Sequence, residues 1–141
     1  MYSIEVGSTI LSCLNLKIGE KKEYDFLEVA QKAHTDFEGN ITLTENTEVF
    51  NSFLVMEDEI WVSGPSTLYH LDLESGEMNY YQLMNDEKYY GIEALYTDGK
   101  QLYATTCSLY ETEKSFHRIL TEEVEVDSMG NLILKVESLT K

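Results

Sequence analysis

The stretch FLVMEDEIWVSGPSTLYHLDLESGEMNYYQL, from Phe53 to Leu83, decides the fold class of this chain. Short apolar and aromatic runs alternate in it with turn signals at residues 57–59, 64–66 and 73–76. β-Branched and aromatic residues favour strands, whereas glycine, proline, serine and acidic residues between such runs favour turns. The stretch therefore predicts four antiparallel strands joined by short turns, which is a β-meander.

A second group of strands is predicted further along the chain. Thr97-Asp98-Gly99-Lys100 contains the Asp-Gly pair that is typical of a hairpin turn. Strand-like runs surround it at residues 92–96, 101–105, 108–111, 115–120 and 126–134.

The N-terminal part carries a mixed signal. Apolar residues at helical spacing over residues 24–33 predict a short helix, with Asp25 as its cap. Strands are expected around it at residues 2–6, 10–18 and 41–44, with a turn at residues 19–22. We therefore expect one mainly β domain over residues 1–141, made of antiparallel meanders in two to three blade-like sheets with one short N-terminal helix.

The two strand groups share a pattern. Ile60-Trp61-Val62-Ser63 matches Leu102-Tyr103-Ala104-Thr105, and Thr67-Leu68-Tyr69 matches Ser108-Leu109-Tyr110, with a period of about 42 residues. Residues 50–136 thus resemble the four-stranded blades of a β-propeller. The resemblance carries no catalytic residues. Since a closed propeller needs about four to eight blades, it implies either several chains completing one ring or an open sheet or sandwich.

Acidic residues dominate the charge of the chain. Ten lysines and arginines stand against 26 aspartates and glutamates, which gives a formal net charge of −16, spread equally over the halves before and after His70. Such a surface repels nucleic acid and anionic membranes and speeds encounter with a basic protein. The alternative, that the charge only keeps the protein soluble, stays open, although a magnitude of about 2–8 suffices for a small domain.

Several protein classes are disfavoured. Cys13 and Cys107 lie too far apart to indicate a disulfide framework. The N-terminus lacks the basic region of a signal peptide, and the longest apolar run, Phe53-Leu54-Val55-Met56, is far shorter than a membrane span. We therefore expect a protein of the cytoplasm that does not bind membranes.

Motifs for catalysis and for cofactors are missing as well. His34, His70 and His117 have no partner at metal-ligand spacing, and the acidic turns at residues 36–40 and 72–76 lack the spacing of a calcium loop. Nucleotide-binding glycine motifs and a nucleophile elbow are absent. We expect no metal, no cofactor and no enzymatic activity. A hydrolase with a carboxylate pair remains a third hypothesis, because 26 acidic residues offer no way to choose the pair.

The charge leads to the main functional hypothesis. We expect a non-enzymatic binding protein of the immunity or inhibitor type that neutralises a basic protein partner, such as a toxin or a nuclease, and does not bind nucleic acid directly. The alternative is an oligomeric, propeller-like binder of a small ligand or sugar; the sequence does not fix the oligomeric state. The candidate partner-binding residues are the acidic Glu57, Asp58, Glu59, Glu122, Glu123, Glu125 and Asp127 and the aromatic Trp61, Tyr80 and Tyr81.

Overall fold

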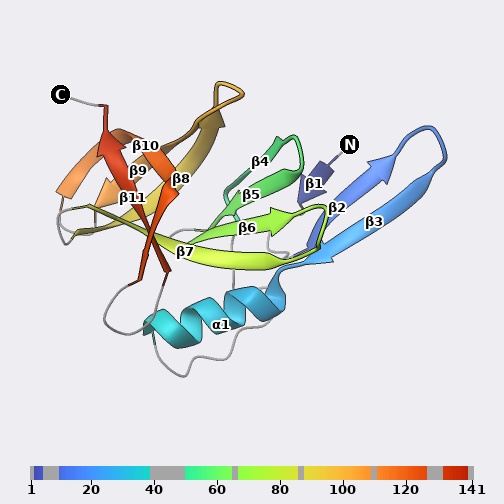
Figure 1. Ribbon diagram of the computed structural model, residues 1–141, viewed down its shortest axis with the longest axis horizontal. Helices are drawn as coiled ribbons and strands as arrows, with labels where there is room; N and C mark the ends of the chain where they lie inside the picture. Colours follow the sequence, from blue (N-terminus) through green and yellow to red (C-terminus); the bar gives the residue numbers. More distant parts are fainter. Residues whose placement is uncertain are drawn as a thin grey trace. The chain divides into compact units, whose positions relative to one another are not determined.

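The chain divides into two units, residues 1–50 and residues 51–141, and each is described separately below. A computed structural model (Figure 1) describes residues 2–4, 10–38, 50–64, 67–85, 88–108, 111–126 and 132–139. Units defined by contact density can belong to one domain, so the single domain expected from the sequence stays a prediction.

The first unit combines a small antiparallel sheet with a helix. Its strands are β1 (Tyr2–Ile4), β2 (Ile10–Asn15) and β3 (Glu20–Asp25), in that order in the sheet, and helix α1 (Leu27–Glu38) follows. Asp25 caps the helix as predicted, because its Oδ1 accepts a hydrogen bond from the Leu27 N–H at 2.9 Å. Cys13, on β2, is a free thiol.

Two boundaries predicted for this unit are wrong. The strand expected over residues 10–18 ends at Asn15, where the side-chain oxygen accepts the Lys17 N–H and the backbone oxygen accepts the Gly19 N–H. Gly19 has a φ of 70°, which ends the strand in a turn and leaves Leu16 and Ile18 exposed. Residues 20–25 then form β3 instead of a turn and the first helical turn, so the helix runs from Leu27 to Glu38.

The strand expected at residues 41–44 lies outside the described residues. Among the described residues, no helix has the length and the apolarity needed to cross a membrane.

The second unit consists of eight strands in one sheet. Consecutive strands are antiparallel neighbours from the first to the last, and β11 also pairs in parallel with β7, so β7 to β11 close into a five-stranded barrel (Figure 1). The strands are β4 (Ser52–Met56), β5 (Glu59–Ser63), β6 (Leu68–Asp72), β7 (Met78–Asn85), β8 (Lys88–Thr97), β9 (Leu102–Ser108), β10 (Glu111–Val126) and β11 (Leu132–Ser138).

The fold class expected from the sequence is confirmed: the protein is mainly β, with antiparallel meanders and one short N-terminal helix. The four-stranded meander over residues 53–83 corresponds to β4 to β7. The strand expected at residues 115–120 lies within β10, which is longer than predicted. Of the strand expected at residues 108–111, Ser108 ends β9 and Glu111 begins β10, and residues 109–110 lie outside the described residues. The likeness of residues 50–136 to propeller blades stays a prediction.

Strand β7 belongs both to the open part of the sheet and to the barrel. Its residues 78–81 pair with β6, whereas Leu83 and Met84 pair with β8 on one edge and with β11 on the other. Figure 1 shows β7 as a long curved strand that passes from one part into the other. The closing seam between β7 and β11 contains three residue pairs, against seven between β10 and β11.

An apolar core fills the barrel, and two residues of the open part, Trp61 and Leu68, join it. Its other buried members come from all five barrel strands and are Leu83, Ile92, Leu95, Leu102, Ala104, Ile119, Leu134 and Val136. All of these side chains are at most 5% exposed. Removal of this apolar surface from water is the main force that holds the barrel closed.

Polar contacts fix the start of β4 against β8. The pairing of β8 with β9 is irregular between Ile92 and Ala94. Beside this irregularity, Asn51 Nδ2 donates to the Ile92 oxygen at 2.8 Å and the Leu95 N–H donates to Ser52 Oγ at 3.1 Å. These bonds satisfy backbone groups of β8 that β9 does not reach, and they set the position of β4 relative to the β8–β9 hairpin.

Candidate functional site

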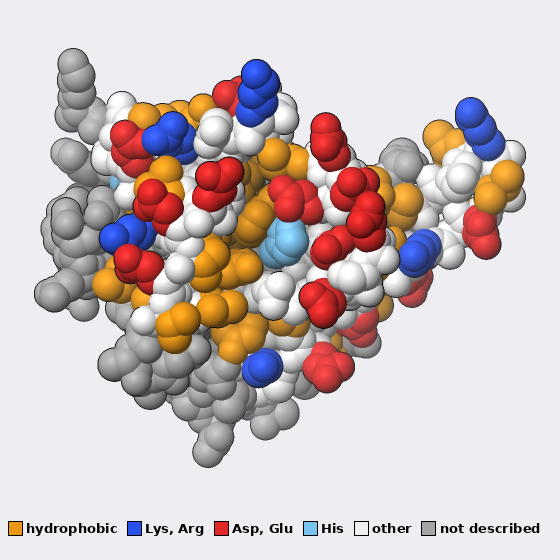
Figure 2. Space-filling model, viewed as in Figure 1, with side chains coloured by type: hydrophobic (Ala, Val, Ile, Leu, Met, Phe, Trp, Pro, Cys, Tyr) orange, Lys and Arg blue, Asp and Glu red, His pale blue; other side chains and the backbone are white. Residues whose placement is uncertain are grey.

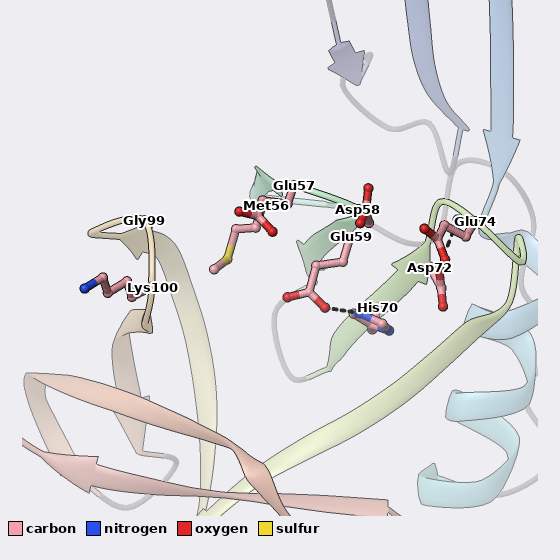
Figure 3. A pocket seen from close by; sticks show the side chains of 9 residues that line it. All are labelled: Met56, Glu57, Asp58, Glu59, His70, Asp72, Glu74, Gly99 and Lys100. Carbon is pink, nitrogen blue, oxygen red and sulfur yellow. Dashed lines mark hydrogen bonds and ion pairs between the residues drawn. The ribbon is translucent and has the colours of Figure 1, made fainter.

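A hollow of about 430 Å³ opens in the second unit where two turns meet the β8–β9 hairpin. We call it the acidic pocket because five of its nine lining residues are carboxylates. It is lined by Met56, Glu57, Asp58, Glu59, His70, Asp72, Glu74, Gly99 and Lys100 (Figure 3). The sequence-predicted Glu57, Asp58 and Glu59 thus lie together on its wall.

A tight turn presents two of these carboxylates. Met56 pairs with Glu59 in the register of β4 and β5, so Glu57 and Asp58 alone form the turn. Glu57 has a φ of 40°, a conformation that favours glycine and costs energy for a residue with a side chain. The backbone carbonyl oxygen of Asp58 accepts a hydrogen bond from the Leu73 N–H at 2.9 Å. This bond connects the turn to the one between β6 and β7.

The third carboxylate, Glu59, is held by two partners. Its Oε2 lies 2.8 Å from His70 Nε2 (Figure 3). Its Oε1 accepts a hydrogen bond from Trp61 Nε1 at 3.1 Å. The Trp61 and His70 rings are 4.4 Å apart between centroids, tilted by 48°. Trp61 is only 5% exposed, so it orients Glu59 from the core and offers little surface to a partner.

The hairpin register explains this arrangement. Trp61 lies opposite His70, and Glu59 lies opposite Asp72. Side chains two residues apart share a face of a strand, and diagonal cross-strand neighbours are within reach of long side chains. His70 was not among the residues predicted to bind a partner. The sequence does carry a signal for its position. The turn between β5 and β6 sets the register of these two strands, and this register brings His70 beside Glu59 and Trp61.

The two candidate tyrosines separate. The Tyr81 ring lies 6.1 Å from that of Trp61, and burial together with the negative charge of Glu59 raises the pKa of its hydroxyl. Tyr80 precedes it on β7 and pairs with Tyr69, so its side chain lies on the opposite face of the strand. The structure therefore brings Tyr81 to the site and places Tyr80 away from it.

The second predicted acidic group stands on an irregularity of β10. Pairing with β11 jumps from Leu120–Lys135 to Val124–Leu134, so residues 121–123 bulge out of the strand and carry the exposed Glu122 and Glu123. We call residues 121–123 the β10 bulge. They line a hollow of about 230 Å³ together with Lys100, Gln101, Arg118 and Leu120. Lys100, in the turn between β8 and β9, lines both hollows. The carboxylates of the acidic pocket and those of the β10 bulge therefore both lie beside the β8–β9 hairpin.

The remaining candidates differ in their surroundings. Glu125 Oε1 lies 3.0 Å from Lys135 Nζ, so its charge is already paired. Asp127 lies outside the described residues.

The acidic pocket holds more negative charge than its own cations neutralise. Within the described part of the chain, no lysine, arginine or histidine forms an ion pair with Glu57, Asp58 or Glu74. Lys100 lines the pocket, but its side chain extends away from the other labelled residues (Figure 3). Figure 2 shows carboxylates gathered around a histidine on this face. Such a surface attracts ammonium and guanidinium groups.

A metal site is not found in the described ranges, where no group of three or more histidine, cysteine, aspartate or glutamate side chains could hold an ion. Comparison of the chain with protein-family models, with curated proteins and with solved structures gives no match.

Proposed function

We propose that this protein is a non-enzymatic binding protein of the inhibitor or immunity type, acting in the cytoplasm on a basic protein partner such as a toxin or nuclease. The observation that supports the proposal is the set of carboxylates in the acidic pocket, of which Glu57, Asp58 and Glu74 form no ion pair with a described residue. Lysine and arginine side chains of the partner would enter this pocket and also contact the β10 bulge.

Two features favour a protein partner over a free cation. Lys100 lines both the acidic pocket and the hollow beside the β10 bulge, so the carboxylates of the pocket and those of the bulge lie on one surface. A basic protein surface can contact both groups at once, whereas a single small cation contacts one. Long-range attraction toward a net charge of −16 would make association fast and sensitive to salt.

The carboxylates would have different roles. Glu57 and Asp58 stand on an exposed turn and would contact the partner directly, whereas Glu59 is already bonded to His70 and Trp61. Glu59 would therefore set the local charge and the position of His70. Trp61 and Tyr81 would support the pocket from below.

The first experiment is to use the purified protein as bait in a lysate of its source organism, with elution by salt. A basic protein that is retained at low salt and released at high salt is the expected result. Retention of no protein, or retention that salt does not affect, contradicts the proposal.

Affinity for the retained protein is then measured with the double variant Glu57→Lys/Asp58→Lys. We expect a loss of about tenfold or more, because like charges replace attractive ones at the contact. The control is Glu20→Lys/Glu77→Lys, which changes the net charge equally at exposed positions outside the pocket lining. Equal affinity of the two double variants would refute the role of the pocket.

The alternative from the sequence, an oligomeric propeller-like binder of a small ligand or sugar, requires several chains in one ring. Light scattering tests it, since a monomer in solution excludes that assembly.

A further inference from the structure

A histidine is buried among the strands of the barrel. His117, on β10, is 2% exposed, and its Nδ1 lies 2.7 Å from the hydroxyl of the fully buried Thr106 on β9. That hydroxyl also lies 3.3 Å from the Ser115 oxygen, to which it can donate. The Tyr90 ring of β8 lies 4.7 Å from the imidazole between centroids. Three neighbouring barrel strands thus enclose the ring.

The surroundings of His117 contain no described counter-charge. Its cross-strand neighbours are Ala104 on β9 and Ser138 on β11, and the titratable group that faces it from β8 is Tyr90. Glu137 and Arg118, the charged residues next to these positions, form an ion pair with each other on the other face of the strands. Among the side chains that the structure describes, none carries a negative charge toward the imidazole.

Protonation of this ring is therefore costly while the barrel stays closed. A buried imidazolium without an opposite charge loses its hydration and gains no compensating ion pair. The cost disappears if the barrel opens and water reaches β10. The β7–β11 and β7–β8 pairings are the smallest of the barrel, with three residue pairs each. Since β7 and β8 follow each other directly in the chain and stay tethered, the barrel opens most readily at the seam between β7 and β11.

We propose that protonation of His117 opens the barrel along the β7–β11 seam, so that the fold contains an acid-sensitive latch. His117 is well placed for this role because it sits on β10, whose partner β11 forms one side of the seam. The latch is a property of the free protein and does not depend on the function proposed above.

The direction of the pH effect follows from burial. Desolvation lowers the pKa of His117 below its ordinary value of 6.5. The open state therefore binds the proton at a higher pH than the closed state does. The contribution of a neutral His117 to the closed barrel is complete above about pH 6.5 and is lost as the pH falls from there toward the lowered pKa.

Amide hydrogen exchange of the full chain tests the latch. Protection is measured between pH 7.5 and pH 5.0, corrected for the intrinsic pH dependence of exchange, in β11 and β7 and, for reference, in β5. We expect the protection of β11 relative to β5 to fall by up to about tenfold per pH unit below 6.5, which is the limit for one proton. A ratio that stays constant with pH would overturn the proposal.

The matched variants are His117→Gln and His70→Gln. His117→Gln should remove the pH dependence of the ratio, whereas His70→Gln, at the histidine of the acidic pocket, should keep it. An unchanged pH dependence in His117→Gln would overturn the proposal. If that variant does not fold, the imidazole of His117 is titrated by NMR in the wild-type chain. The protection of β11 should then change with the same pH midpoint as the imidazole. Protection that does not follow this titration refutes the latch.

Discussion

The open meander β4–β6 and the barrel β7–β11 each contain a histidine, and the two histidines have different surroundings. His70, in the meander, is half-buried and bonded to the carboxylate of Glu59, with the Trp61 ring beside it. His117, in the barrel, is buried against a threonine hydroxyl. The open face of the meander keeps charges in contact with water, whereas closure of the barrel excludes them. The difference explains why the candidate site lies on the turns of the meander and not inside the barrel.

The same contrast predicts where stability resides. Leu134 of β11 is fully buried in the barrel core, and its replacement by alanine should lower the free energy of unfolding by about 2–5 kcal/mol. The control is Leu139→Ala, because Leu139 is 47% exposed and should change the free energy by less than about 0.5 kcal/mol. Urea unfolding measures both. Equal losses of unfolding free energy in the two variants would show that burial in the barrel core is not the main source of stability.

The polar bonds of the meander should contribute less. Glu59→Leu removes the acceptors of both His70 and Trp61 and should cost about 1–2 kcal/mol. Glu59→Gln keeps an acceptor while removing the same charge, so it should cost less than half as much. Trp61 is the one tryptophan of the sequence, so thermal unfolding followed by its fluorescence reports on this region directly. An equal cost for the two variants would mean that charge, and not hydrogen bonding, holds Glu59 in place.

The smallest effect is expected at the turn of the meander. Glu57→Gly should raise the free energy of unfolding by up to about 1 kcal/mol, because glycine adopts the φ of 40° without strain. Glu57→Ala removes the same charge but keeps a Cβ, so it separates the backbone effect from the electrostatic one. Chemical denaturation of the two variants decides the point: if alanine stabilises as much as glycine, repulsion among the carboxylates is the cause.

Strands with local signals were predictable from the sequence. The meander at residues 53–83 was found because each strand is bounded by residues that form turns, and Asp25 was recognised as a cap because capping needs only local chemistry. The end of β2 was missed, since the apolar Leu16 and Ile18 continue an alternation that Asn15 and Gly19 interrupt through backbone geometry. Closure of β11 onto β7 joins residues far apart in sequence and leaves no local trace.

The candidate site was predictable only in part. A run of three acidic residues marked Glu57, Asp58 and Glu59, and the structure places them together on one pocket. His70 and Asp72 reach that pocket through cross-strand register, which composition does not show. Trp61 was expected among the partner-binding residues because of its residue type, and the structure places its side chain in the core. Burial of a strand residue depends on which face of the sheet packs against other strands. The sequence of β5 alone does not show that the face carrying Trp61 is buried.

The seam between β7 and β11 also has a consequence for the order of folding. Gln82 and Ile133 pair across about 50 residues of intervening chain, whereas every other neighbouring pair in this sheet is a consecutive antiparallel pair. Local hairpins form early because their loops are short, and a contact of long sequence separation forms late. During synthesis, β4 to β10 can assemble as a growing sheet while the core stays open to water. The ring is completed only after residues 132–138 have left the ribosome, so the apolar face of the growing sheet stays exposed to water until that moment.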